Sequence, residues 1–270
     1  MGNIKTNAYA HFNVEVRDRI AFISFNRPDK MNAVNQRISD DIPLVLKDFR
    51  ASDDADVAVV TGEGRAFSIG GDLQLMQDMN DDPETHLPDL IATAGDLVRA
   101  HLDLDKPIIA AINGPAMGAG AAMALLCDII IMERHATISD GHLMGALTAG
   151  DGGALIWPLA VGLTRAKKYL LTADWISAEE AERIGLVSEV VDTGDSLRRA
   201  TEIAKRFAGA PQVPLRFTKR ALNLWLWQNL PIFEQSLALE AISISRADVA
   251  RTIDKIRTSR TTAMPPDPRG

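Results

Sequence analysis

Two side chains in the second half of the chain, His142 and Asp151, are of the types that proton transfer needs. A histidine and a carboxylate within hydrogen-bond reach of each other can move protons near neutral pH. Asp151 stands in the run Gly150–Gly153, just before a predicted helix, and Asp140 is close in sequence. The pair is a candidate acid/base centre. Two structural alternatives stay open at this point: Asp151 as a helix N-cap, and His142 as a solvated or core residue.

Two glycine-rich turns form a second candidate feature. The first runs from Gly62 to Leu73 and the second from Lys106 to Ala122, and each leads from a predicted strand into a predicted helix. This arrangement leaves backbone N–H groups free at the helix N-terminus. Two such ends that converge would stabilise a developing oxyanion, by about 3–4 kcal/mol for each well-placed donor. Either turn alone is explained more simply as a tight turn beside a closely packed helix.

Several common catalytic signatures are absent from the sequence. Gly118 and Gly120 do not extend to a Gly-x-Gly-x-x-Gly fingerprint, because Met123 stands at its last position. The chain has no Gly-Lys-Ser/Thr and no His-Glu-x-x-His, and Ala66 breaks the Gly-x-Ser-x-Gly pattern around Ser68. The five histidines lack the spacing of metal ligands, so the sequence predicts no metal site. Dinucleotide, kinase, serine hydrolase and zinc hydrolase chemistry all lose support.

The composition indicates a globular protein that binds neither nucleic acid nor a membrane. The 270 residues are 46% hydrophobic and 24% charged, and a chain of this length buries a sizeable core without disulfides. A net charge of −7 argues against nucleic-acid and membrane surfaces, and no apolar run is long enough to span a bilayer. One cysteine, Cys127, and an N-terminus without an apolar segment predict a reducing, cytoplasmic location.

The hydropathy pattern predicts the elements that position these residues. Phe12–Arg17 and Ile20–Phe25 are typical of a two-stranded hairpin. Strands and helices then alternate, which indicates an α/β core with largely parallel strand pairing. Residues 80–88 are rich in proline and acidic residues and predict a surface loop. The pattern becomes wholly helical late in the chain, so we expect a core at 1–192 and a C-terminal helical segment at 193–270.

The motifs, taken in order, resemble one known family over most of the chain. The segments are Asn26–Ala33, Ala66–Asp72, Asn113–Asp128, Gly150–Gly153 and Ala178–Val187. Together they are similar to the crotonase superfamily, also called the enoyl-CoA hydratase/isomerase family. The resemblance implies an α/β fold with a crotonase-like ββα spiral core and a helical C-terminal segment. It also implies an acyl-CoA substrate, whose CoA is carried by the substrate, so that no separate cofactor is expected.

The resemblance assigns roles to single positions. The two amides that hold the thioester oxygen in the family fall on Gly71 and Ala119, and alanine keeps the N–H group. The positions that match CoA contacts in the family are Met31, Ala33, Ile69, Gly71 and Asp72. The candidate partners of the CoA phosphates are Arg27, Lys30 and Arg65.

The sequence departs from the family at the residues that hydrate a double bond. Typical hydratases of the family hold water between two glutamates, and the matching positions here are Ala122 and Gly141. Two-glutamate hydration is therefore not supported. The spacing of His142 and Asp151 is similar to that in 6-oxocamphor hydrolase, a relative that cleaves a β-diketone without CoA. That similarity is partial, because the additional histidine of that enzyme would fall around Ala119.

Three functions follow as hypotheses. The leading one is an enzyme that processes an acyl-CoA through an enolate held by Gly71 and Ala119, in a hydration, isomerisation or lyase reaction. The second is a C–C bond hydrolase that uses His142 and Asp151. The third is a family member that has lost catalysis, or a non-enzymatic RNA-binding member. The charge of −7 and the lack of a dense basic stripe argue against RNA.

The C-terminal segment predicts an assembly. The resemblance implies a homotrimer or a dimer of trimers, with the helices after Asp192 at the interface. An independent reason is the apolar content of those helices, which includes Leu222, Leu226, Leu237 and Leu239. The proline-rich end, Thr261–Gly270, is expected to fray.

Overall fold

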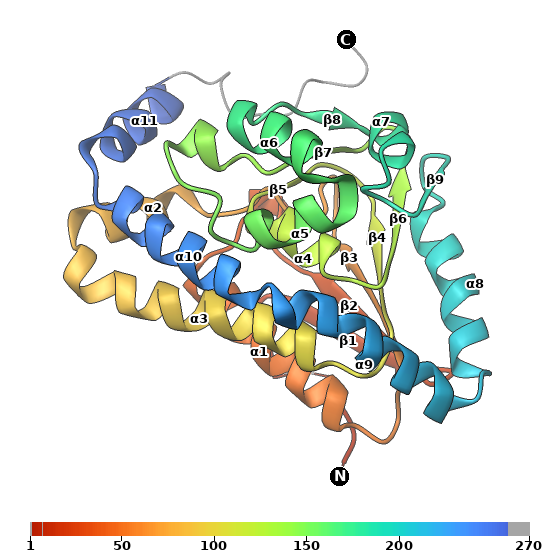
Figure 1. Cartoon of the computed structure of the whole chain (residues 1–270). Helices are drawn as coiled ribbons and strands as arrows, with labels where there is room; N and C mark the ends of the chain where they lie inside the picture. Colours follow the sequence, from red (N-terminus) through yellow and green to blue (C-terminus); the bar gives the residue numbers. More distant parts are fainter. Residues whose placement is uncertain (1, 7, 259–270) are drawn as a thin grey trace.

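The computed structural model describes residues 2–6 and 8–258, and its centre is a six-stranded sheet (Figure 1). The strand order is β1-β2-β3-β4-β6-β9. The hairpin of β1 and β2 is antiparallel, and every later pair in this sheet is parallel, which confirms the predicted α/β core. The strands are β1 (Phe12–Arg17), β2 (Ile20–Phe25), β3 (Val57–Gly62), β4 (Ile108–Ile112), β6 (Ile129–Glu133) and β9 (Glu189–Val191).

A second, three-stranded sheet in the order β5-β7-β8 lies close to the candidate site. Its strands are β5 (Ala116–Met117), β7 (Thr137–Ser139) and β8 (Ile176–Ser177). β5 leads directly into the second glycine turn, and β7 leads into Asp140 and His142. Because β5 and β7 pair in parallel, the chain emerges from both strands at the same edge. This small sheet therefore brings two of the predicted site segments together.

Helices cover both faces of the large sheet, because its strands β2, β3 and β4 bury side chains on both sides. Ala21, Ile23 and Phe25 of β2 belong to the larger apolar cluster, while Ile20 and Phe22 belong to a smaller one. The smaller cluster is closed by α8 (Ser196–Ala208), and the larger by helices that include α1 (Gln36–Ala51), α4 (Ala119–Leu125) and α5 (Gly153–Val161). Further helices before β9 are η1 (Pro28–Lys30), η2 (His142–Gly145), α6 (Leu163–Thr172) and α7 (Ala178–Arg183).

The predicted surface loop at 80–88 is wrong, because the segment is helical. Only Asp82 separates α2 (Leu73–Asp81) from α3 (Pro83–Asp103). Asp82 accepts a hydrogen bond from the Thr85 amide at 3.3 Å, which caps α3. Pro83 stands at the first helical position, where its missing N–H and fixed φ cost nothing. Here proline and aspartate mark a helix start, and α3 becomes long enough to form a wall of the site.

The chain after β9 is helical as far as the structure describes it. The helices are α8, α9 (Gln212–Gln228), α10 (Leu230–Ile244) and α11 (Ala247–Thr258), and Figure 1 shows α9 and α10 crossing the molecule beside α3. The predicted frayed end, 261–270, lies outside the described residues. None of the helices described is long and apolar enough to cross a bilayer.

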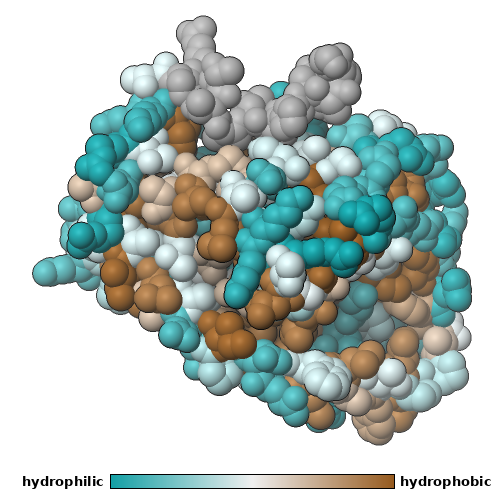
Figure 2. Space-filling view, turned by 45° about the horizontal axis from the view of Figure 1, so that its top comes forward, coloured by the Kyte–Doolittle hydropathy of each residue, from teal (hydrophilic) through white to brown (hydrophobic). Residues whose placement is uncertain are grey.

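The C-terminal helices leave apolar side chains on the surface. Leu222 is 62% exposed, Trp225 64% and Leu239 47%. The expectation that Leu237 is part of such a surface is wrong, because it is 4% exposed and packs in the core cluster. Figure 2 shows apolar patches interrupting a hydrophilic surface on the face that it draws.

Candidate active site

The two glycine turns converge, as the sequence predicts. Ser68 of the first turn accepts a hydrogen bond from the Met117 amide at 2.9 Å and forms an isolated β-bridge with Ala116. A Cβ at position 118 would lie 3.7 Å from the Gly70 Cα, so the two backbones touch. Gly70 has a φ of +77°, and a Cβ there would lie 2.7 Å from the Met117 carbonyl oxygen. Glycine is therefore required for this close approach.

The amides of Gly71 and Ala119 lie next to this contact and line one cavity. Ala119 is the first residue of α4, so its N–H has no partner within the helix. No hydrogen bond from either amide occurs within residues 2–6 and 8–258. Gly71 is exposed, Ala119 is half-buried, and both residues line the cavity. Two amide donors directed at one oxygen can stabilise negative charge on it.

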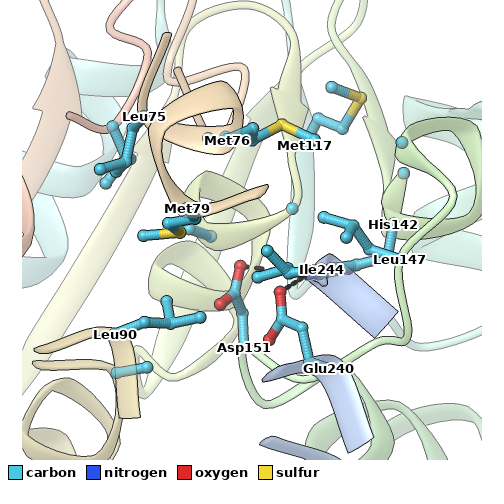
Figure 3. Close-up of a pocket in the computed structure, with 18 of the residues that line it drawn as sticks. Leu75, Met76, Met79, Leu90, Met117, His142, Leu147, Asp151, Glu240 and Ile244 are labelled. Atoms are coloured by element: carbon cyan, nitrogen blue, oxygen red, sulfur yellow. Dashed lines mark hydrogen bonds and ion pairs between the residues drawn. The ribbon is translucent and has the colours of Figure 1, made fainter. Parts of the chain in front are cut away.

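The structure brings His142 and Asp151 together at the other side of the same cavity. His142 Nε2 lies 3.2 Å from Asp151 Oδ2, and His142 Nδ1 lies 2.8 Å from Asp140 Oδ1. Glu240 adds a third carboxylate, with Oε1 3.6 Å from His142 Nε2. Figure 3 shows the carboxylates of Asp151 and Glu240 directed toward the histidine. The histidine is thus held between carboxylates on both ring nitrogens.

These neighbours set the protonation of the cluster. Burial lowers the pKa of His142, but the charge and hydrogen bond of Asp140, and then those of Asp151, outweigh burial and raise the pKa well above 6.5. Burial is also the largest influence on Glu240, and together with Asp151 it raises the pKa of that carboxyl well above 4.5. Both shifts favour the protonated forms of His142 and Glu240, and these two groups line the cavity together with Asp151.

The packing of neighbouring carboxylates explains why glycine stands at both ends of the Gly150–Gly153 run. A Cβ at position 150 would clash with Oε2 of Glu240, and a Cβ at position 153 would clash with Oδ2 of Asp140. The two glycines leave room for two carboxylates that reach the histidine from opposite sides. The next helix, α5, has Gly152 as its N-cap and no capping side chain. The alternative of Asp151 as a helix cap is therefore wrong.

Glu240 is the residue that the sequence analysis missed. It lies on α10, within the C-terminal segment expected to serve assembly, and is only 3% exposed. The buried positions of α10 repeat at helical spacing as Phe233, Leu237, Glu240 and Ile244. An acid inside an otherwise apolar stripe was the signal that could have found it. Its Oε2 atom is buried and has no hydrogen-bond partner among the described residues.

The five predicted CoA-contact residues come from two paired segments. Ile69 donates its amide to the Met31 carbonyl at 3.2 Å, and the Asp72 amide donates to Val34 at 2.9 Å. Ala33 lies between them on the same strand-like segment. Of the five, Ile69 and Gly71 line the cavity. The structure therefore places the predicted residues together, and their contact with CoA stays a prediction.

Arg27 and Asp72 engage each other rather than a ligand. Arg27 Nη1 lies 2.6 Å from Asp72 Oδ2 and donates to the Ala33 carbonyl at 3.1 Å. Asp72 also caps α2 by accepting from the Gln74 amide at 2.8 Å. Burial would raise the pKa of Asp72, but these hydrogen bonds outweigh it and lower the pKa. The pair fixes the turn beside Gly71, and Lys30 and Arg65 remain the exposed candidates for phosphate.

The two positions that the resemblance matches to the hydratase glutamates are Ala122 and Gly141. Ala122 is 6% exposed on α4 and lies outside the cavity lining. Gly141 lines the cavity with a φ of +70°, and a Cβ there would clash with the Met117 side chain. A glutamate at 141 would therefore be strained and would displace Met117.

Three of the acid/base side chains also have the proximity of metal ligands. His142, Asp151 and Glu240 each offer an atom within 4.8 Å of the others. A histidine binds a metal through a neutral ring nitrogen, and a carboxylate on its other nitrogen, as Asp140 is here, occurs in metal sites and in acid/base sites alike. That the chain has no metal site therefore stays a prediction from the sequence.

Comparison with known proteins identifies the family. The family model described as enoyl-CoA hydratase/isomerase matches residues 15–241. The chain is 33% identical over 239 residues to a crotonyl-CoA hydratase of Syntrophomonas wolfei, covering 87% of this chain and 88% of that protein. It is 33% identical over 212 residues to the 1,2-epoxyphenylacetyl-CoA isomerase of Escherichia coli, covering 77% of this chain and 80% of that protein.

A solved structure agrees with this result. The crystal structure of an enoyl-CoA hydratase/isomerase from Mycobacterium paratuberculosis has a TM-score of 0.88 and 32% identity, and the match covers 92% of this chain and 99% of that one. The fold is therefore the crotonase fold that the motifs predict. The chain belongs to the enoyl-CoA hydratase/isomerase family, the crotonase superfamily.

Proposed function

We propose that the chain is an enzyme that acts on an acyl-CoA through a thioester enolate. One observation carries this proposal: the free amides of Gly71 and Ala119 and the carboxylate of Asp151 line the same cavity. The thioester oxygen accepts from the two amides, which stabilise the enolate charge. CoA comes with the substrate and follows the paired segments around Ile69.

Asp151 is the proposed proton-transfer residue. Its Oδ2 pairs with the His142 imidazolium at 3.2 Å, and the 18% exposure of its side chain leaves it open to the cavity. The carboxylate removes a proton from the acyl chain next to the thioester and can return it to another carbon or to a leaving group. This is the work of a double-bond isomerase or a lyase.

His142 and Glu240 support that role. The imidazolium compensates the charge of Asp140 and Asp151, so that two carboxylates can be buried side by side. The raised pKa of Glu240 favours its protonated form beside them, and its Oε2, which has no hydrogen-bond partner among the described residues, is available to exchange a proton with the pair. With Ala122 and Gly141 at the glutamate positions, we expect crotonyl-CoA hydration to be slow.

The C–C bond hydrolase remains the second candidate, because the His142–Asp151 pair that it needs lies within hydrogen-bond reach. It ranks below the first because its histidine would act as a base toward water. An imidazolium has no free lone pair for that step. A member without catalysis is the third candidate.

A panel of substrates separates the three. Enoyl-CoA thioesters, saturated acyl-CoA thioesters and cyclic β-diketones are incubated with the protein and the products are read by mass spectrometry. Isomerised or eliminated CoA thioesters support the proposal. Ring-opened acids from the diketones would favour the hydrolase, and binding of CoA thioesters without turnover would favour the third candidate. Rapid hydration of crotonyl-CoA would refute the importance that we give to the missing glutamates.

We also propose that the protein is a homotrimer or a dimer of trimers. The exposed apolar residues of α9 and α10, such as Leu222 and Leu239, support an interface there. Light scattering should give a mass near three or six times the 29.3 kDa of one chain. A stable monomer at micromolar concentration would contradict it.

A further inference from the structure

The cavity that contains the acid/base cluster continues into a chamber with apolar walls. The whole cavity has a volume of about 200 Å³, and the chamber extends between four helices. Its aliphatic walls come from α2, α3, α10 and α11. The aliphatic residues of these walls are Leu73, Leu75, Leu90, Leu97, Ile244 and Ile256. Figure 3 shows Leu75, Met79 and Leu90 on one side of Asp151, and Leu147 and Ile244 close to it. A ligand held at Gly71 and Ala119 therefore has its acyl part among aliphatic side chains.

The charges in this chamber have one sign apart from the histidine. Within residues 2–6 and 8–258, no lysine or arginine lines it, and its acids are Asp140, Asp151 and Glu240. His142 already pairs with Asp140 at 2.8 Å and Asp151 at 3.2 Å. A second carboxylate on the acyl group would therefore be buried among acids without a cation of its own.

The walls are also adaptable in shape. Four methionines line the chamber, namely Met76, Met79, Met117 and Met144. Methionine has an unbranched, polarizable side chain that fills irregular apolar gaps and adjusts to different ligands. Walls made only of branched side chains would select one shape of acyl chain. The methionine side chains let these walls accommodate a bulky or ring-shaped hydrocarbon.

We infer that the acyl group of the substrate is an uncharged hydrocarbon, larger than a four-carbon chain. This inference rests on the proposed function, and it names the substrate class of the same site. It separates this chain from enzymes of small acyl-CoA thioesters and of dicarboxylic ones.

Calorimetric titration of the full chain with three CoA thioesters tests the inference without turnover. The probes are butanoyl-CoA, octanoyl-CoA and the eight-carbon octanedioyl-CoA, with free CoA as reference. Each buried CH₂ contributes about fourfold in affinity, so octanoyl-CoA should bind at least about tenfold tighter than butanoyl-CoA. Octanedioyl-CoA should bind at least about tenfold more weakly than octanoyl-CoA.

A matched pair of variants locates the effect. Ala94 lines the chamber on α3, while Ala92 is exposed on the same helix. Ala94→Phe should bring the octanoyl and butanoyl affinities to within about threefold of each other, and Ala92→Phe should leave their ratio unchanged.

Equal affinity of wild-type protein for octanoyl-CoA and butanoyl-CoA would overturn the inference while leaving the proposed function intact. Tighter binding of octanedioyl-CoA than of octanoyl-CoA would also overturn it. If none of the thioesters bound better than free CoA, the proposed function would fall, and the inference with it.

Discussion

Replacing Asp151 by Asn separates its proposed catalytic role from a structural one. Asn keeps the shape of the side chain and removes the charge that would accept a proton. A positioned general base contributes about 10²–10⁴ in rate, so turnover should fall by that factor, equal to about 2.7–5.5 kcal/mol in activation free energy.

The effect on folding should be smaller than the effect on rate. Loss of the sole partner of a buried charge costs about 3–5 kcal/mol. His142 keeps Asp140 at 2.8 Å and Glu240 at 3.6 Å in the variant, so its imidazolium is not left alone. The free energy of unfolding should therefore fall by less than about 3 kcal/mol.

Hydrogen exchange next to the thioester provides the assay, because it requires only enolate formation. Octanoyl-CoA is incubated with enzyme in D₂O, and incorporation of deuterium at the α-carbon is followed by mass spectrometry. Asp89→Asn serves as the control, because Asp89 is exposed on α3. Exchange by Asp151→Asn within threefold of the wild type, with the fold intact by circular dichroism, would refute the assignment of Asp151 as the base.

Three further predictions follow from the same geometry. Gly71→Pro removes one amide donor and should lower turnover by at least about 100-fold. Gly71→Ala keeps the amide, and the added Cβ would lie 3.8 Å from Met76, so this variant should retain most activity. Equal activity of the two variants would exclude a catalytic role for the Gly71 amide. In urea titrations, Glu240→Gln should become more stable relative to the wild type as pH rises above 4.5. A carboxyl whose pKa is raised in the folded state contributes stability at low pH, and the wild type loses this contribution as pH rises through that pKa. A constant difference across pH would contradict this. Gly150→Ala should cost about 1–3 kcal/mol of unfolding free energy through its clash with Glu240, whereas Gly209→Ala, with its nearest contact at 3.5 Å, should cost less; equal costs would contradict the steric reason.

The sequence predicted the turns because their chemistry is local. Gly70 and Gly118 meet a conformational requirement that can be seen in a few residues, and the strands before them were visible from their apolar runs. The segment at 80–88 failed because proline and aspartate can end a helix or begin one. Only the packing of α3 against α1 and α10 decides between the two.

The acid/base cluster could be predicted only in part. His142 and Asp151 lie close in sequence, so their pairing could be proposed from spacing. Glu240 reaches them from a helix 89 residues after Asp151, and nothing local indicates which face of that helix meets the core. The role of Gly150 in leaving space for Glu240 is equally invisible without the fold.

The position of Glu240 connects the site to the proposed assembly. α10 turns Glu240 inward at 3% exposure, while its neighbours Leu239 and Ile242 are 47% and 63% exposed. One helix thus presents a buried acid to His142 and apolar side chains to the surface. If a second subunit covers that surface, the contact holds α10 against the acid/base cluster. The Glu240 carboxyl then stays beside Asp151. The C-terminal segment would then serve both the proposed site and the proposed interface, since Glu240 and the exposed Leu239 and Ile242 lie on the same helix.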